Sequence, residues 1–327
     1  MSFFAILFAL LIEQVRPLAR SNPIHSGLRG WARWVAGNFD AGKPHHGWVA
    51  WGLAVPGPAI AAMAVHILLV VYAGWVFAML WSVAVLYVTL GFRQFSHHFT
   101  NIRDALDSGD EAAARQLLAQ WQQVDASELP RSEIVRHVIE YSVLAAHRHV
   151  FGVLGWFSVL AAFGLGPAGA VLYRMSEFVY GYWQHAGKTS DHPVSPALLS
   201  VASRAWSAID WLPARVTALG FAVVGSCEEA IDCWRNYAQR FPNDNDGVVL
   251  AATSGALNVR LGGEALKTME ALSYSQATPL ELGVDTESTP GRDPELAHLR
   301  SVVGLVWRAV VLWMGMLALL TLAKLLG

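Results

Sequence analysis

Long uncharged runs dominate the pattern of hydrophobic and polar positions along this chain. A helix needs about 20 mostly apolar residues to cross the hydrocarbon core of a bilayer. Residues 48–92 contain no Asp, Glu, Lys or Arg, and the small residues near position 73 mark a tight turn inside this run. The pattern therefore predicts two membrane helices, over residues 48–72 and 74–92.

Other segments show the same apolar character, with charged residues at their edges. They are residues 1–12, 151–173, 206–225 and 302–326. The first lacks the preceding positive charge and the small-residue cleavage site of a signal peptide, and Glu13, Arg16 and Arg20 follow it, so we interpret it as a retained helix. The chain is predicted to be an all-α, polytopic transmembrane bundle of about six spans.

The polar segments between these runs are periodic as well. Phe95, Phe99, Ile102 and Leu106 recur at helical spacing, and apolar positions resume after the turn at Ser108. This pattern predicts a helical hairpin. We expect five parts: membrane helices in 1–92, a cytoplasmic hairpin in 93–149, membrane helices in 150–226, a helical and loop segment in 227–301, and a last span in 302–327.

The positive residues predict the orientation, because Lys and Arg are retained on the cytoplasmic side. They gather in three segments, namely those around 16–43, 93–148 and 235–300. With six spans, all three segments fall on one side of the membrane. We therefore expect a multi-pass membrane protein with both termini outside and three cytoplasmic segments.

Composition agrees with this interpretation and excludes some functions. The chain is 54 % hydrophobic and 15 % charged, whereas soluble domains carry roughly 25 % charge. Its net charge of −2 lacks the basic excess of a nucleic-acid-binding protein, so no nucleic-acid partner is expected. Cys227 and Cys233 are too few for a disulfide framework and form no metal-site pattern. The expected partner is the lipid bilayer.

Ionisable residues near membrane depth are the first candidates for a site, since such groups are costly there. Asp210 and Arg215 flank Pro213 in the sequence DWLPAR. They are interpreted either as an interfacial or intramembrane ion pair, or as a site in which Arg215 binds an anion. Glu13 has the same two interpretations, as an anchor or as a site residue.

A basic cluster formed by His147, Arg148 and His149 comes next, with Glu140 two turns earlier. Histidines two residues apart do not share a helical face, so no metal site is expected. The cluster fits contact with anionic lipid headgroups or, alternatively, binding of a phosphate or carboxylate group.

The segment from Asn258 to Gly263 (NVRLGG) is a further candidate. Gly262 and Gly263 beside Arg260 permit close approach of the backbone to an anion. The sequence has no Walker A, GxSxG, HExxH or dinucleotide-binding motif.

Several of these stretches, in this order, resemble the CobD/CbiB family of cobalamin-biosynthesis membrane proteins. The similar stretches are residues 92–117 (FRQFSHHFTNIRDALDSGDEAAARQL), 133–140 (EIVRHVIE), 211–219 (WLPARVTAL) and 254–263 (SGALNVRLGG). The resemblance implies an adenosylcobinamide-phosphate synthase-like protein, which joins aminopropanol or its phosphate to cobyric acid as an amide. It also implies a location in a bacterial inner membrane and, if the protein is a synthase, a corrinoid ligand and ATP with Mg²⁺.

Under this resemblance Glu140 is the carboxylate near the reacting centre. Arg215, Arg260 and the Gly262–Gly263 turn would hold corrin carboxylates or phosphate. His147, Arg148, His149, Asp210 and Asn258 complete the candidate substrate-binding set.

The chain also departs from that family pattern. Where family synthases carry an ENT-x-DG signature after the glutamate, this chain has Leu-Ala-Ala-His147-Arg148-His149. Glu13, the Asp210 to Arg215 stretch and Glu228 with Trp234 resemble AmpE, a related membrane modulator of β-lactamase signalling. The alternative function is therefore a non-catalytic sensor with a signalling partner. Small residues at positions 59–64 would also permit a homo-oligomer.

Overall fold

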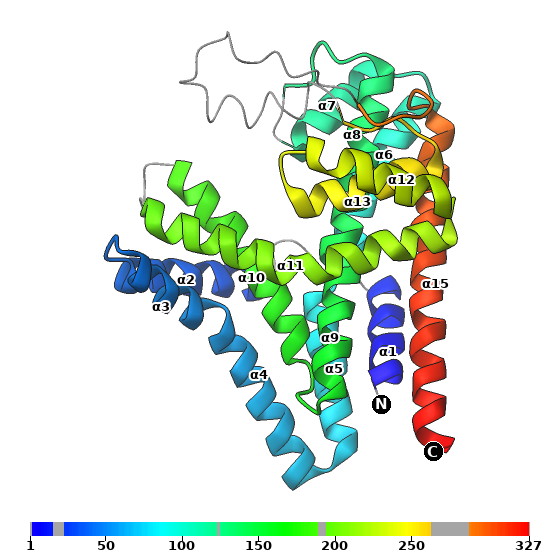
Figure 1. Ribbon diagram of the computed structural model, residues 1–327. Helices are drawn as coiled ribbons and strands as arrows, with labels where there is room; N and C mark the ends of the chain where they lie inside the picture. The colour runs from blue at the N-terminus through cyan, green and yellow to red at the C-terminus, as the bar shows by residue number, and fades with distance from the viewer. Residues whose placement is uncertain (1, 16–22, 123–124, 189–193, 263–287, 327) are drawn as a thin grey trace. The chain divides into compact units, whose positions relative to one another are not determined.

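The computed structural model describes the chain except for residues 1, 16–22, 123–124, 189–193, 263–287 and 327 (Figure 1). The described residues form helices and turns without a β-strand; their only β-type pairing is an isolated parallel bridge between Val259 and Arg292. The all-α prediction is thus confirmed.

The helices follow one another along the whole chain. They are α1 (Ser2–Val15), α2 (Pro23–Phe39), α3 (Pro44–Ala54), α4 (Pro56–Leu68), η1 (Leu69–Ala73), α5 (Trp75–Thr89), α6 (Phe92–Asp107), α7 (Glu111–Gln122), α8 (Arg131–Ala146), η2 (His147–Phe151), α9 (Gly152–Ala162), α10 (Ala168–Lys188), α11 (Pro196–Val224), α12 (Cys227–Tyr237), η3 (Ala238–Arg240), α13 (Asp244–Leu257) and α15 (Leu296–Leu326).

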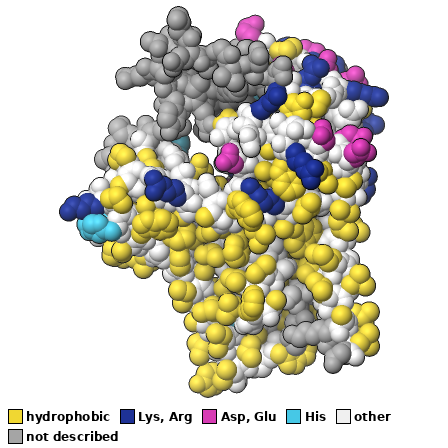
Figure 2. Space-filling view, viewed as in Figure 1, with side chains coloured by type: hydrophobic (Ala, Val, Ile, Leu, Met, Phe, Trp, Pro, Cys, Tyr) yellow, Lys and Arg dark blue, Asp and Glu magenta, His cyan; other side chains and the backbone are white. Residues whose placement is uncertain are grey.

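Four helical stretches among the described residues are long and apolar enough to cross a membrane: Pro44–Ala73, Arg131–Ala162, Pro196–Val224 and Leu296–Ala323. The predicted first and third spans are shorter apolar helices, α1 with 14 residues and α5 with 15. Large hydrophobic side chains are exposed on α4, η1 and α5, among them Ile60, Val71 and Phe77. Hydrophobic side chains also dominate the surface around α4 (Figure 2). A membrane protein accounts for this exposure, because lipid would cover those side chains.

The prediction of one helix over residues 151–173 is wrong. α9 ends at Ala162, and α10 begins at Ala168. Between them Gly164 (φ 79°) and Gly166 (φ 58°) adopt left-handed backbone conformations that favour glycine. The apolar stretch is instead continuous with α8 on its N-terminal side, as the span Arg131–Ala162 shows.

The structure consists of two compact units. The first comprises residues 1–94, 148–213 and 314–327. Its core includes Ala32 of α2, Trp183 of α10 and Leu198 of α11. A Cβ atom on Gly169 of α10 would lie 2.0 Å from the Trp156 carbonyl oxygen, so glycine allows α9 and α10 to pack closely.

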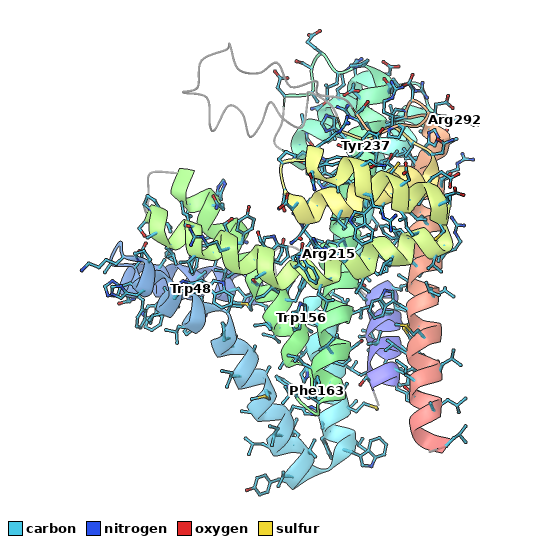
Figure 3. All side chains as sticks on the ribbon, viewed as in Figure 1. Trp48, Trp156, Phe163, Arg215, Tyr237 and Arg292 are labelled. Atoms are coloured by element: carbon cyan, nitrogen blue, oxygen red, sulfur yellow. The ribbon has the colours of Figure 1, made fainter. Side chains whose placement is uncertain are left out.

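Pro213 lies inside α11 and has no N–H to donate to the carbonyl of Ile209, four residues earlier. The indole Nε1 of Trp156 donates to that carbonyl oxygen at 2.9 Å instead. Figure 3 labels Trp156 on α9. A side chain of a neighbouring helix thus replaces the backbone hydrogen bond that the proline removes.

The second unit comprises residues 95–147 and 214–313. The predicted hairpin of α6 and α7 turns at residues 108–110, where Gly109 has φ 79°. α12 packs on α13 through Gly255, whose added Cβ would lie 2.1 Å from the Glu229 carbonyl oxygen. α8 also contacts α13, and this brings Glu140 close to the end of α13.

Candidate functional site

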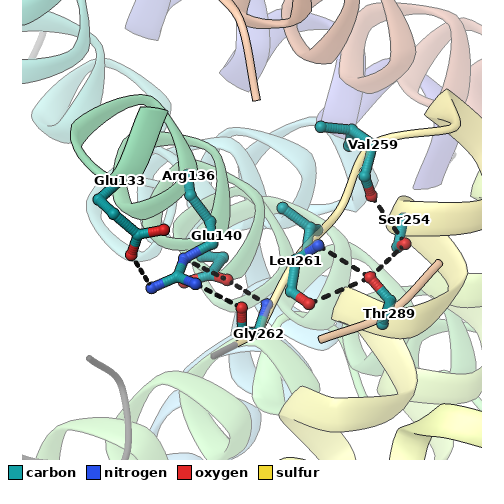
Figure 4. Close-up of polar contacts among 8 residues, drawn as sticks. All are labelled: Glu133, Arg136, Glu140, Ser254, Val259, Leu261, Gly262 and Thr289. Atoms are coloured by element: carbon teal, nitrogen blue, oxygen red, sulfur yellow. Dashed lines mark hydrogen bonds and ion pairs between the residues drawn. The ribbon is translucent and has the colours of Figure 1, made fainter. Parts of the chain in front are cut away.

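Glu140 and Arg136, one turn apart on α8, both bind the backbone of Gly262 (Figure 4). The Gly262 N–H donates to Glu140 Oε1 at 2.7 Å. Arg136 Nη1 donates to the Gly262 carbonyl oxygen at 2.5 Å. The two side chains therefore hold both backbone groups of one residue, which joins α8 to the segment that follows α13.

This pair of charges is buried. Glu140 is 1 % exposed and Arg136 is 6 % exposed, and Arg136 Nε lies 3.9 Å from Glu140 Oε1. Arg136 also forms an ion pair with Glu133, the preceding acid on the same helix face. Burial of these charges is tolerable because each has an opposite charge or a hydrogen bond close by.

The second oxygen of Glu140 differs from the first. Oε2 is buried and has no hydrogen-bond partner among the described residues. Since a buried carboxylate oxygen without a donor is costly, a ligand that brings an N–H or O–H group would be stabilised there. The arrangement can therefore accept a hydrogen bond or a proton.

A second set of bonds holds the same segment from its other side. The Leu261 N–H donates to Thr289 Oγ1, and the Thr289 N–H donates to the Leu261 carbonyl oxygen, both at 2.8 Å. Ser254 Oγ lies 2.6 Å from Thr289 Oγ1. Ser254 is fully buried and Thr289 is almost so, and this hydroxyl pair pins residues 259–262 against α13.

Asn258 begins this segment and turns the chain. It has φ 52° and ψ 48°, the left-handed conformation that often ends a helix, and its carbonyl oxygen accepts from the Arg292 N–H at 3.1 Å. The Arg260 N–H donates to the Arg292 carbonyl oxygen at 2.8 Å, and the Arg260 side chain pairs with Asp293 at 3.1 Å. Arg260 and Arg292 thus lie together on an exposed edge, and Figure 3 labels Arg292 there.

Among the candidate residues, Glu140 contacts Gly262 directly, and Asn258 and Arg260 lie in the same segment as Gly262. Gly263 lies outside the described residues. His147 is fully buried, and its Nδ1 lies 2.9 Å from Thr217 Oγ1 on α11. Arg148 and His149 follow in η2 and are partly exposed.

The two candidates on α11 have different partners. Asp210 is fully buried, and its Oδ1 accepts a hydrogen bond from the Tyr173 hydroxyl at 2.7 Å. Arg215 Nη1 donates to Asn245 Oδ1 at 3.1 Å, at the start of α13. The anion-binding role of Arg215 and the substrate-binding role of Asp210 stay predictions.

Sequence reasoning missed four side chains of this network, namely Glu133, Arg136, Ser254 and Thr289. Arg136 stands four positions before Glu140, and helical spacing alone could have paired them. Ser254 lies inside the stretch that resembles the family, whereas Thr289 had no local signal. In the part of the chain that the structure describes, no three His, Cys, Asp or Glu side chains gather as a metal site.

Comparison with known proteins identifies relatives over most of the chain. The family model described as CobD/Cbib protein matches residues 5–280. A cobalamin biosynthesis protein CobD of Stutzerimonas stutzeri is 29 % identical over 319 residues, which cover 95 % of both chains. The protein of the same name from Chromobacterium violaceum is 34 % identical over 183 residues, which cover 56 % of this chain and 55 % of that one.

A cobalamin biosynthesis protein CobD of Mycobacterium tuberculosis is 31 % identical over 229 residues, covering 66 % of this chain and 64 % of the relative. No solved structure matches the chain. The resemblance to AmpE stays a prediction. The family match over most of the length, together with the membrane-type helices, confirms the predicted family: this chain belongs to the CobD/CbiB family of cobalamin-biosynthesis membrane proteins.

Proposed function

We propose that this protein joins aminopropanol, or its phosphate, to a carboxyl group of cobyric acid as an amide, at the cytoplasmic face of a bacterial inner membrane. Membership of the family supports the pathway. The buried carboxylate of Glu140 at the Gly262 turn is the observation that supports a reaction at this place.

The reaction needs a base, because an amine attacks only after its ammonium form loses a proton. Glu140 Oε2 is suited to this task, since it is buried and has no donor among the described residues. The Gly262 N–H and Arg136 hold the other oxygen, so the carboxylate has a fixed orientation. In our proposal Oε2 accepts a hydrogen bond from the ammonium group and then takes its proton.

The new C–N bond forms as the corrin carboxyl group loses one oxygen and the nitrogen loses two protons, the first to Glu140 and the second to the departing phosphate. ATP supplies the driving force as a co-substrate, with the lost oxygen leaving in inorganic phosphate and ATP becoming ADP. Mg²⁺ bound with ATP would take most of its ligands from the phosphates and from water, and we assign no step to the metal.

Basic residues near the turn would hold the anionic parts of the substrates. Arg260 and Arg292 lie on the exposed edge beside Gly262, and each guanidinium can bind a phosphate through two N–H groups. Arg215 on α11 is the further candidate for a corrin carboxylate. Asp210, His147, Arg148 and His149 keep the substrate-binding role predicted from the sequence.

The test is binding of adenosylcobyric acid to the detergent-purified chain, followed by addition of ATP and aminopropanol phosphate and detection of the amide. The decisive variant is Glu140→Gln, because the glutamine carbonyl can still accept from the Gly262 N–H but cannot take a proton. We expect it to bind the corrinoid as the parent chain does and to form amide at least about 100-fold more slowly.

The matched control is Glu128→Gln, which alters an exposed acid in the same unit. It should retain full turnover. Turnover by Glu140→Gln at the parent rate would refute the role of Glu140. Corrinoid binding without amide formation by the parent chain would refute the synthase, and absence of binding would favour the AmpE-like modulator.

A further inference from the structure

An apolar groove opens in the first unit between α2, α4, α5 and α10. Its volume is about 460 Å³, within the range of ordinary ligand pockets. Small and branched side chains form most of its wall, among them Leu28, Ala61, Ala84 and Val85. Arg174 is the one charged residue among the described residues of that wall, and it forms an ion pair with Glu177.

The groove lies along helices that carry lipid-facing surface. α4 belongs to the stretch Pro44–Ala73, which is long and apolar enough to span a membrane. Ile60 of α4 and Leu80 of α5 are more than half exposed, although both are large and apolar. An open apolar groove on such helices fits a hydrocarbon chain better than a polar solute.

α2 forms one wall of the groove and has two contrasting faces. Ala32 and Val35 are fully buried in the core, whereas Arg29, Arg33 and Trp34 are exposed. Trp34 is 50 % exposed and stacks on Trp31 at 5.4 Å between ring centroids. Exposed arginine and tryptophan on an amphipathic helix are typical of a helix in the plane of a membrane interface.

The position of α3 also indicates that α2 lies at the level of the membrane interface. α3 packs on α2, Trp31 Nε1 donates to the Ala54 carbonyl oxygen at 3.3 Å, and Trp48 at its outer side is 49 % exposed (Figure 3). Tryptophan is enriched where the apolar core meets the headgroups. The level of α2 is therefore the level at which a lipid phosphate lies.

The charges of α2 are suited to an anionic headgroup. Arg29 and Arg33 stand one helical turn apart, and both are exposed. The acid nearest in sequence, Asp40, is occupied by Ser195, whose N–H and hydroxyl bond its two oxygens. Arg33 Nε donates to the neutral Tyr182 hydroxyl at 3.4 Å, and this contact does not neutralise the guanidinium. The exposed side of the helix therefore keeps a positive charge.

We propose that the groove holds one acyl chain of an anionic phospholipid, whose phosphate lies against Arg29 and Arg33. The first turn of α2, with Ile24 and Leu28 in the wall, joins the basic surface to the groove. A single lipid would therefore bind α2 to α4, α5 and α10 within this unit.

Native mass spectrometry of the full-length chain in detergent tests the proposal, with phosphatidylglycerol and phosphatidylcholine of the same acyl chains added in equal amounts. We expect one phosphatidylglycerol to remain bound in clear excess over phosphatidylcholine. Arg29→Ala and Arg33→Ala should each lower this preference about fivefold. Arg235→Ala, at an exposed site on α12, should leave it unchanged.

The groove is tested separately by filling it. Ala61→Phe and Ala84→Phe place a ring in the wall from exposed positions, so folding is preserved. Both should lose retention of either lipid, whereas Ala64→Phe, exposed on α4 but outside the groove, should retain it. If Ala61→Phe, Ala84→Phe and Ala64→Phe retain the same amount of lipid, the groove does not bind the acyl chain. A parent chain that is a dimer without bound lipid would contradict the proposal as well.

If the parent chain retains phosphatidylglycerol and phosphatidylcholine equally, Arg29 and Arg33 do not select the headgroup.

Discussion

Arg136 and Glu140 carry opposite charges into a part of the second unit where water is excluded. Each residue binds a different group. Glu140 accepts a hydrogen bond from the Gly262 N–H, whereas Arg136 donates to the Gly262 carbonyl oxygen and forms an ion pair with Glu133. Removal of Arg136 leaves Glu140 buried without a cation, whereas removal of the Glu140 charge leaves Arg136 its ion pair with Glu133. The two residues are therefore expected to matter for folding as well as for chemistry.

We predict that Arg136→Ala lowers the free energy of unfolding by about 3–5 kcal/mol, because Glu140 then stays buried without its cation. The double variant Arg136→Met/Glu140→Gln should lose less than Arg136→Ala alone, since it removes both charges. Thermal unfolding in detergent at one scan rate measures this. An Arg136→Ala chain as stable as Arg235→Ala would contradict the prediction.

The two cysteines differ in reactivity as well. Cys227 is exposed, whereas Cys233 is buried, and burial, followed by the nearby Asp232, raises the pKa of the Cys233 thiol. Because the thiolate is the reactive form, a raised pKa leaves less of it at a given pH. At pH 7.5 we expect maleimide to label one site only.

Mass mapping of the labelled peptides checks this expectation. Cys227→Ser should remove nearly all rapid labelling, while Cys233→Ser should leave it unchanged. Labelling of Cys233 in the folded chain should rise as pH rises, since the thiolate fraction rises. Equal labelling rates at Cys227 and Cys233 would show that α12 does not protect Cys233.

At the scale of helices, small residues decide which elements approach closely. Gly255 lies against the backbone of Glu229, where α13 packs on α12. Gly255→Ala should therefore push the two helices apart and cost about 1–3 kcal/mol. Gly220→Ala is the control, because no atom lies within 4 Å of its added Cβ, and alanine should be neutral or more stabilising there. Equal unfolding temperatures of the two variants would contradict this account.

The bond between Trp156 and the Ile209 carbonyl should couple energetically to Pro213. With proline present, Trp156→Phe leaves that carbonyl without its donor and should cost about 1–3 kcal/mol. With Pro213→Ala, the restored backbone N–H can reach the same carbonyl, so Trp156→Phe should cost less. A double-mutant cycle measures this coupling, and additive effects would rule it out.

Sequence patterns predicted the helical elements better than their ends. The apolar runs at 48–72 and 302–326 lie in long helices, because length and a mostly apolar composition suffice there. The helix over 151–173 was wrong because the apolar run continues through Gly164 and Gly166, where the backbone turns. A glycine in an apolar run can allow two helices to pack closely, or it can allow the backbone to turn. Hydropathy alone does not distinguish these two cases.

The residues of the candidate site could be predicted from the sequence only where they lie in stretches that resemble the family. Glu140 and the segment 258–262 stood out as stretches similar to a family, and the structure brings them together. Arg136 lies within the similar stretch 133–140. Its hydrogen bond, however, goes to the carbonyl oxygen of Gly262, a residue far along the chain. Thr289 contacts Leu261 across a long separation in sequence, and no local pattern encodes such a contact.

For the whole molecule, the topology is the main untested expectation. The positive residues predict that both termini lie outside and that residues 227–301 lie in the cytoplasm. The boundaries of the five predicted parts and a homo-oligomer also stay predictions. Cysteine labelling can test the topology, because Cys227 is exposed.

In a Cys233→Ser chain, we expect a membrane-impermeant maleimide to label Cys227 in inside-out vesicles but not in intact spheroplasts. A cysteine at Ala73, an exposed position in the turn before α5, should show the opposite result in a chain without the natural cysteines. Labelling of both sites from the same side would contradict the predicted number of spans.

The paired backbones of residues 258–262 and 289–292 have a further consequence for hydrogen exchange with solvent. The amide hydrogens of Arg260, Leu261, Gly262, Thr289 and Arg292 all donate to acceptors within the protein. An amide held in this way exchanges only when the structure around it opens. These five amides should therefore be protected together in deuterium, and one opening event should release all of them.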